Sequence, residues 1–187
     1  MHAPFSKTLI DLIIEQAERY PELPAVIDER GTLTYPQLRD RAFKVAAALR
    51  EAGVGMGDQV GILINNRAEW IEVCLAVAAI GATAAPFSTW STPRELDFLL
   101  RDSDARVLFM IDRFGERDYG VELAPLLHDP ASRPPALEHI VSVGDAALPG
   151  TSAYAAFIAR CRRLWTEEPR PIASRYLATV RRARSKP

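Results

Sequence analysis

The chain has 187 residues, of which 48% are hydrophobic and 25% are charged, and this ordinary globular composition excludes a disordered or fibrous protein. The formal net charge of −1 is unevenly distributed: residues 1–161 carry 15 Lys and Arg against 22 Asp and Glu, and residues 162–187 carry 8 against 2. No run approaches the roughly 18 apolar residues of a membrane span. The two cysteines and three scattered histidines do not suggest a disulfide framework or a metal site. We therefore expect a cytoplasmic location.

The N-terminal third predicts a helix, a hairpin and a second helix. Thr8 is placed to cap the first helix, and Pro21 ends it. Residues 25–34 predict a β-hairpin, because two short apolar runs flank a turn with a glycine. Thr34 begins the second helix, since Gln37 three residues later completes a capping box.

Buried strands and helices alternate through the middle of the chain. Short apolar runs predict strands over residues 58–64, 82–87 and 106–111, and helix-length segments occupy 69–80 and 92–104. Alternating strands and helices joined by short links are the pattern of a parallel sheet covered on both faces. The predicted fold class is therefore α/β: a largely parallel, doubly wound sheet with helices on both faces.

The remaining elements are less regular. Residues 112–119 are expected to form a polar loop, followed by a helix over 120–128 and a strand over 137–143. A further helix is expected over 152–163, where apolar residues recur at helical spacing.

A change of composition divides the chain into two parts. Residues 1–161 are expected to form one α/β subdomain. Residues 162–187 form a basic tail rich in Arg and Pro that is expected to lie outside the fold, with one short helix over 172–184. Such a tail could bind nucleic acid or an anionic surface.

The helix over residues 69–80 is apolar on nearly every side, which is typical of a helix buried between layers. We therefore expect Trp70 and Cys74 to be core residues. Nothing in the sequence around Cys74 would stabilise a reactive thiolate.

Asn65 and Asn66 follow the first strand of the predicted parallel sheet. The carboxyl end of such strands is where ligands bind in open α/β sheets, so Asn66 is a candidate cleft residue. The alternative is that these asparagines only satisfy backbone groups in a turn.

Short motifs distributed over residues 8–143 resemble the opening of the adenylate-forming (AMP-binding) acyl-CoA synthetases. Each motif is weak alone, but their order and spacing together are specific. The resemblance is carried by Leu33-Thr34-Tyr35, Leu38, Gly53-Val54, Gly57-Asp58, Val60, Asn66-Arg67-Ala68-Glu69-Trp70, Gly81-Ala82, Pro86 and Glu95-Leu96. Within the family, the run from Pro86 to Trp90 is more similar to fatty or aryl acid-CoA ligases than to amino-acid-activating domains.

The resemblance implies a ligase reaction. Members of the family join a carboxylic acid to ATP as an acyl-adenylate and usually pass the acyl group to coenzyme A, so ATP, Mg and coenzyme A are implied for the full-length family. The sequence lacks the Gly-rich phosphate loop ending in Pro-Lys-Gly, the Tyr-x-x-Thr-Glu and Thr-Gly-Asp runs and the late catalytic lysine. We therefore expect only an N-terminal subdomain, with no catalytic residue, no metal ligand and no activity alone.

The resemblance also singles out two arginines. In acyl-CoA-forming relatives, the loop that corresponds to residues 112–119 approaches the nucleotide of coenzyme A, so Arg113 and Arg117 look like phosphate contacts. The competing interpretation is local surface pairing with Asp112, Glu116 or Asp118.

Three hypotheses follow. The preferred one is a truncated N-terminal part of an acid-CoA ligase, its tail being the product of an early stop or a changed reading frame. The second is a non-catalytic module that assembles with a separate chain carrying the remaining subdomains. The third is a binder of nucleic acid or an anionic surface that acts through the basic tail, although nucleic acid is the less expected partner.

Overall fold

The computed structural model describes residues 8–129, 131–144 and 148–159. The predicted tail at 162–187, with its helix, lies outside the described residues. In chain order the elements are α1 (Leu9–Arg19), β1 (Pro24–Asp28), β2 (Gly31–Thr34), α2 (Tyr35–Glu51), β3 (Gln59–Leu63), α3 (Ala68–Ile80), β4 (Thr83–Pro86), α4 (Pro93–Asp102), β5 (Ala105–Met110), β6 (Arg113–Phe114), β7 (Arg117–Asp118), α5 (Tyr119–Glu122), α6 (Ala124–His128), β8 (His139–Ser142), β9 (Ser152–Ala153) and α7 (Tyr154–Ala159).

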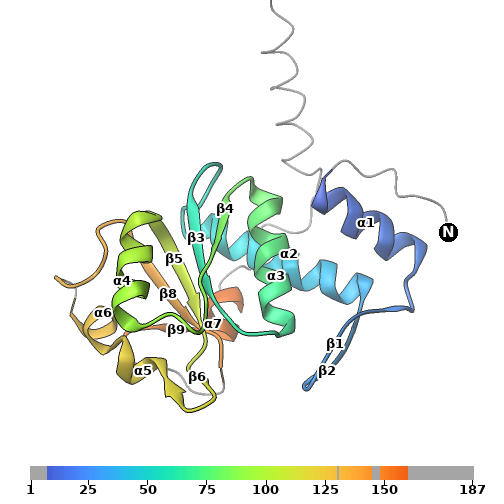
Figure 1. Cartoon of the computed structure of the whole chain (residues 1–187). Helices are drawn as coiled ribbons and strands as arrows, with labels where there is room; N and C mark the ends of the chain where they lie inside the picture. Colours follow the sequence, from blue (N-terminus) through green and yellow to red (C-terminus); the bar gives the residue numbers. More distant parts are fainter. Residues whose placement is uncertain (1–7, 130, 145–147, 160–187) are drawn as a thin grey trace, which may run out of the picture.

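A parallel sheet of five strands forms the centre of the molecule, in the order β4-β3-β5-β8-β9. Helices α2, α3 and α7 lie on one side of the sheet, and α4, α5 and α6 lie on the other (Figure 1). The predicted doubly wound α/β class is confirmed. The β1–β2 hairpin forms a separate antiparallel pair that projects beside α2 and α3 (Figure 1).

Local capping signals place the helix ends where the sequence predicts them. The Thr8 hydroxyl accepts a hydrogen bond from the Asp11 N–H at 3.0 Å. Thr34 and Thr92 each form a complete capping box, which satisfies amide donors that a helix N-terminus otherwise leaves unpaired. Gly81 ends α3 with φ of 74°, a left-handed conformation that favours glycine.

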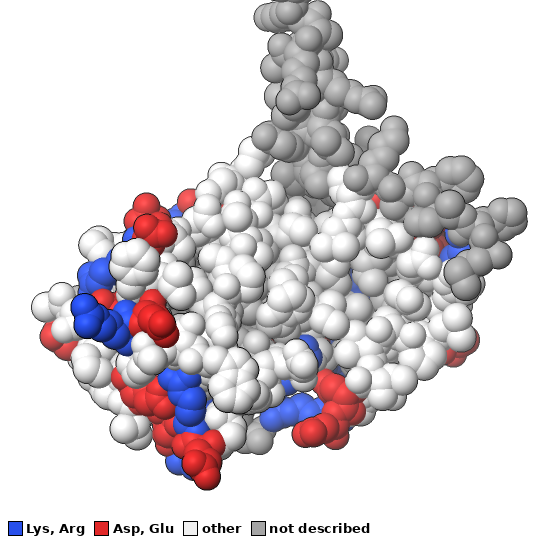
Figure 2. Space-filling view, viewed as in Figure 1, with Lys and Arg blue, Asp and Glu red and all other residues white. Residues whose placement is uncertain are grey.

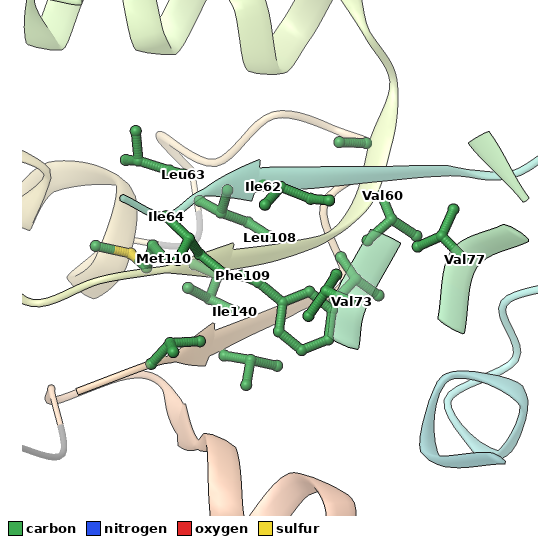
Figure 3. Close-up of a cluster of buried hydrophobic side chains, with 14 of the residues drawn as sticks. Val60, Ile62, Leu63, Ile64, Val73, Val77, Leu108, Phe109, Met110 and Ile140 are labelled. Carbon is green, nitrogen blue, oxygen red and sulfur yellow. The ribbon is translucent and has the colours of Figure 1, made fainter. Parts of the chain in front are cut away.

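The main core fills the space between the sheet and its helices. Figure 3 shows Phe109 of β5 directed toward Val73 of α3, with neighbouring apolar side chains from β3 and β8. Gly61 of β3 is required by this packing, because a Cβ atom there would lie 2.7 Å from a ring carbon of Phe87. A second, smaller cluster joins α1, α2 and α3 through Ile10, Ile13, Leu38, Ala42, Phe43 and Leu75.

Three expectations about secondary structure are wrong in detail. The loop at 112–119 contains the short β6–β7 hairpin. The helix expected over 120–128 is divided into α5 and α6, because Pro125 lies in the first turn of a new helix that begins at Ala124. The helix expected from residue 152 begins at Tyr154, since Ser152 and Ala153 instead pair with β8 as a fifth strand too short to show a period-2 pattern.

The expectation that Trp70 is a core residue is also wrong, because its side chain is 37% exposed. It lies in the first turn of α3, whereas the buried side of that helix is formed by residues such as Val73 and Val77. Cys74 is half-buried and packs against the main core, as predicted. Burial raises the pKa of its thiol to about 11, so the inert thiol predominates at neutral pH.

Candidate functional site

An open pocket of about 650 Å³ lies at the carboxyl ends of β3 and β4. We call it the Asn65 pocket. Its two walls come from the β1–β2 hairpin and from the segment after β4, and its lining also includes Phe114 of β6. The lining residues are Ile27, Asp28, Glu29, Arg30, Ile64, Asn65, Asn66, Arg67, Phe87, Ser88, Thr89, Trp90 and Phe114.

Asn65 and Asn66 both line this pocket, at the strand end where the sequence places them. Asn66 is exposed and Asn65 is half-buried. The Oδ1 atom of Asn65 is buried and has no hydrogen-bond partner among the described residues. The expected turn-capping role therefore does not account for this atom.

The hairpin wall is fixed by one carboxylate. Asp28 Oδ1 accepts hydrogen bonds from the N–H groups of Arg30 at 2.8 Å and Gly31 at 3.2 Å, which closes the hairpin turn. Its Oδ2 accepts from the Ala68 N–H at 3.0 Å, at the start of α3. The hydrogen bonds from Ala68 and Arg30 lower the pKa of the Asp28 carboxyl below its usual value. One side chain thus holds the hairpin against the sheet edge.

The pocket lining also contains an arginine that is already paired. Arg67 donates to Glu69 through Nη2 at 2.9 Å and Nε at 3.2 Å, and its Nη1 donates to the Val143 carbonyl at 3.3 Å. Burial acts to raise the pKa of Glu69, but the hydrogen bonds from Arg67 and from the backbone, together with the charges of Arg67 and Arg30, outweigh burial, and the pKa lies below its usual value. Arg67 therefore connects α3 to the end of β8.

The wall formed by the segment after β4 is held in place by one carbonyl oxygen that accepts two hydrogen bonds. The Thr89 carbonyl accepts hydrogen bonds from Arg117 Nη1 at 2.7 Å and from the Tyr119 hydroxyl at 2.6 Å. The next residue, Trp90, packs its ring edge-to-face on Phe114 with centroids 5.8 Å apart. Trp90 is nevertheless 80% exposed, so most of the indole faces outward.

Arg113 and Arg117, the two arginines that the sequence singles out, have different environments in the structure. Arg113 is largely exposed, and its Nη2 donates to Asp118 Oδ2 at 2.6 Å, one of the local pairs anticipated. Arg117 is half-buried, forms an ion pair with Glu122 and lies 4.9 Å over the Tyr119 ring. The carboxylate that pairs with Arg117 is therefore Glu122, which lies outside the loop where the sequence placed its partners. Contact of either arginine with coenzyme A stays a prediction.

Sequence reasoning missed a buried polar cluster formed by α2, α3 and α7 on one side of the sheet. Glu72 of α3 is only 2% exposed, and it accepts hydrogen bonds from the Tyr154 hydroxyl at 2.6 Å and Arg41 Nη1 at 3.2 Å. Burial and the adjacent Glu72 raise the pKa of Tyr154, which keeps its hydroxyl protonated as a donor. The only available signal was an acidic residue within an apolar helix, and its partners lie far away in sequence.

Neither a metal centre nor a membrane span is found in the part of the chain that the structure describes. Among those residues, no three His, Cys, Asp or Glu side chains gather closely enough to hold a metal ion. No helix within the same residues has the length and apolar character needed to cross a bilayer.

The sequence match identifies the family. The family of AMP-binding enzymes matches residues 13–178, which is most of the chain, and the chain therefore belongs to this family. The matched range continues past residue 161, where the sequence predicts the end of the subdomain. The predicted resemblance to adenylate-forming ligases is confirmed.

The individual relatives are named as ligases or synthases, and their chains are much longer than this one. The fatty acid–[acyl-carrier-protein] ligase ScoC of Streptomyces coeruleorubidus is 32% identical over 145 residues, which are 78% of this chain and 26% of ScoC. Phenyloxazoline synthase MbtB of Mycolicibacterium paratuberculosis is 44% identical over 92 residues, 49% of this chain and 8% of that protein. Among solved structures, the anthranilate CoA ligase AuaEII in complex with anthranoyl-AMP superposes with a TM-score of 0.72 at 27% identity, covering 85% of this chain and 29% of AuaEII.

Proposed function

We propose that this chain acts as the N-terminal part of an ATP-dependent ligase that activates a carboxylic acid as an acyl-adenylate. The match to the AMP-binding enzymes over residues 13–178 is the observation that carries this proposal. The chain supplies one wall of the clefts for the acid and the acceptor thiol. It does not form the adenylate alone, because the Gly-rich loop ending in Pro-Lys-Gly and the late lysine are absent from its sequence.

The acid is a fatty or aryl acid in this proposal. Support comes from the run Pro86 to Trp90 and from two relatives named for such acids, a fatty acid ligase and an anthranilate ligase. The acceptor is coenzyme A, although ScoC is named for transfer to an acyl-carrier protein. The alternative substrate class, an amino acid, is favoured by the similarity to peptide-type synthases such as MbtB and tyrocidine synthase 3.

Arg113 is the better placed of the two arginines to contact a coenzyme A phosphate. It is largely exposed, and one carboxylate oxygen occupies one of its nitrogens. Arg117 directs Nε and Nη2 to Glu122 and Nη1 to the Thr89 carbonyl, so its guanidinium is already satisfied. In this proposal Arg113 contacts phosphate while Arg117 supports the wall beside it.

The test is ATP–pyrophosphate exchange by the purified chain with a panel of fatty, aryl and amino acids. We expect no exchange above a no-enzyme control. Exchange by the chain alone that a substitution in this chain abolishes would contradict the proposal. Exchange that appears only when a second polypeptide is added would instead support assembly with a separate chain that carries the remaining subdomains.

Coenzyme A contact is tested separately by calorimetric titration. We expect weak binding that Arg113→Ala reduces further. Arg101→Ala is the matched control, because Arg101 is also an exposed arginine paired with an aspartate, Asp97, but lies on α4 and not in the loop at 112–119. An equal effect of both substitutions would indicate nonspecific charge attraction and would remove Arg113 from the site.

A further inference from the structure

The elements β9 and α7 form a small addition to one edge of the sheet. β9 pairs with β8 at two positions, Val141 with Ser152 and Ser142 with Ala153. α7 has six residues, and an isolated helix of that length is not stable in water. These elements, residues 152–159, therefore depend on side-chain contacts with the rest of the molecule, and we call them the edge strap.

The apolar contacts of the edge strap come from one face of α7. The Phe157 ring is buried and lies edge-to-face on Phe109 of β5, with centroids 5.6 Å apart. Tyr154 makes a similar contact with Phe109 at 6.2 Å, and Ile158 packs against the main core while remaining partly exposed. Because Phe157 is the fully buried residue of α7, the edge strap contributes much less apolar burial than α2 or α3.

A hydrogen bond to a buried carboxylate fastens the edge strap to α3. The Tyr154 hydroxyl donates to Glu72 Oε2 at 2.6 Å, whereas Glu72 Oε1 accepts from Arg41 Nη1 of α2 at 3.2 Å. Glu72 is 2% exposed, and the surface over α3 belongs to a broad band without Lys, Arg, Asp or Glu across the middle of the molecule (Figure 2). A buried carboxylate oxygen is costly to leave without a donor, so the closed edge strap needs this hydroxyl.

The turn that leads into the edge strap is anchored independently of it. Leu148 packs on Gly120 of α5, where a Cβ atom would lie 2.7 Å from Leu148 Cδ2. The Leu148 carbonyl accepts hydrogen bonds from the Thr151 N–H at 3.1 Å and from the Thr151 hydroxyl at 2.7 Å, and Gly150 turns the chain with a φ of 78°. β8 is also held without the edge strap, because it pairs with β5 over its whole length. The turn and β8 therefore keep their own contacts when residues 152–159 move.

We propose that the edge strap opens as a unit while the rest of the described fold stays intact, with the turn at residues 148–151 as its hinge and the Tyr154–Glu72 hydrogen bond as its latch. Segments with few buried contacts open in this way at a lower free energy than global unfolding. Opening lets water replace the Tyr154 hydroxyl at Glu72, so the carboxylate is not left unpaired. It also uncovers the outer edge of β8, and an uncovered strand edge is a template for pairing with another strand. The closed edge strap thus controls access to this edge of the sheet.

Hydrogen exchange of the full chain at low denaturant concentrations tests this proposal. The protection factors of amides in residues 152–159 are compared with those in β5, which has a paired strand on each side. We expect the edge strap to be less protected than β5 and its exchange to depend more weakly on denaturant, because its opening exposes less surface. An edge strap with the same protection and denaturant dependence as β5 would open only with the whole fold, and the proposal would be wrong.

Two substitutions separate the latch from global stability. Tyr154→Phe removes the hydroxyl and keeps the ring, so we expect exchange in the edge strap to accelerate by about tenfold or more. Ile62→Val removes one methylene group from the fully buried core at β3, which destabilises the fold as a whole. It should accelerate exchange in β5 and leave the edge strap unchanged, because the altered core is present whether the strap is closed or open. Equal acceleration of both segments by Ile62→Val, or no effect of Tyr154→Phe on the edge strap, would overturn the proposal.

Arg41→Gln is the matched control for the charges of the cluster. The Arg41 guanidinium contacts the other oxygen of Glu72, but Arg41 belongs to α2, which stays in place when the edge strap opens. We expect Arg41→Gln to change exchange in the edge strap by less than about fivefold, because Arg41 is largely exposed. An effect as large as that of Tyr154→Phe would mean that the charge balance of the cluster holds the strap closed, and the assignment of the Tyr154–Glu72 bond as the latch would be wrong.

Discussion

Tyr154→Phe isolates one hydrogen bond within the buried cluster around Glu72. The substitution keeps the aromatic ring, which packs edge-to-face on Phe109 with centroids 6.2 Å apart, and removes only the hydroxyl that donates to Glu72 Oε2 at 2.6 Å. A hydrogen bond to a charged group contributes roughly 1.5–3 kcal/mol, and Glu72 has little access to water as a replacement donor. We therefore expect the free energy of unfolding to fall by about 1.5–3 kcal/mol.

A double-mutant cycle in urea or guanidinium separates this bond from packing effects. Glu72→Gln is measured in the wild type and in Tyr154→Phe, and we expect a coupling energy of about 1 kcal/mol or more, because the two side chains are in direct contact. Arg41→Gln is the control: its guanidinium reaches the same carboxylate from a largely exposed position, so the expected loss is below about 1 kcal/mol. Additive effects of Tyr154 and Glu72, within about 0.3 kcal/mol, would refute the reasoning.

Three further predictions concern stability. Folding lowers the pKa of the Asp28 carboxyl below its ordinary value of 3.8. The ionised Asp28 therefore stabilises the fold fully above pH 3.8, and this stabilisation is lost as the pH falls through the lower pKa of the folded state. The difference in unfolding free energy between wild type and Asp28→Asn should therefore shrink in acid, whereas the exposed neighbour Glu29→Gln should show a small difference at every pH. Trp70→Ala should lower the free energy of unfolding by less than about 2 kcal/mol, because Trp70 is partly exposed. Leu96→Ala should lower it by about 2–5 kcal/mol, because Leu96 is fully buried. Equal losses would place Trp70 in the core after all. Gly81→Ala should lower the free energy of unfolding by about 1–2 kcal/mol, because Gly81 has a positive φ. Gly55→Ala should be near neutral in the same denaturation assay, because the space around Gly55 is open. A neutral Gly81→Ala would mean that the left-handed conformation is not needed.

The elements that the sequence predicts well are those specified by neighbouring residues. Thr34 and Thr92 with their partners three positions later define helix starts, and Gly81 defines a helix end, so the alternation of strands and crossover helices follows from local signals. Asn65 and Asn66 lie where the sequence predicts because the end of a buried strand fixes the edge on which they lie.

The wrong or missing predictions involve partners distant in sequence. Helical periodicity could not distinguish Trp70 from its buried neighbours, because α3 is apolar all round and the side it buries depends on how α2 packs. The buried carboxylate of Glu72 accepts a hydrogen bond from Tyr154, which lies 82 residues later. Similarly, the loop composition around Arg117 gave no indication that Thr89, 28 residues earlier, would accept its hydrogen bond.

These long-range contacts also bear on how the family's chemistry is divided along its chain. Formation of an acyl-adenylate requires cationic and N–H groups that remain available to stabilise charge moving onto pyrophosphate. At the Asn65 pocket, Asp28, Arg67 and Arg117 are instead engaged in holding the hairpin, α3 and the Trp90 segment in place. The side chains that this surface leaves exposed include the apolar Ile27 and Trp90, which suit packing better than the stabilisation of developing charge. Under the proposed function, the groups that stabilise charge on pyrophosphate would come from outside the described residues, while these residues would supply a wall of the cleft.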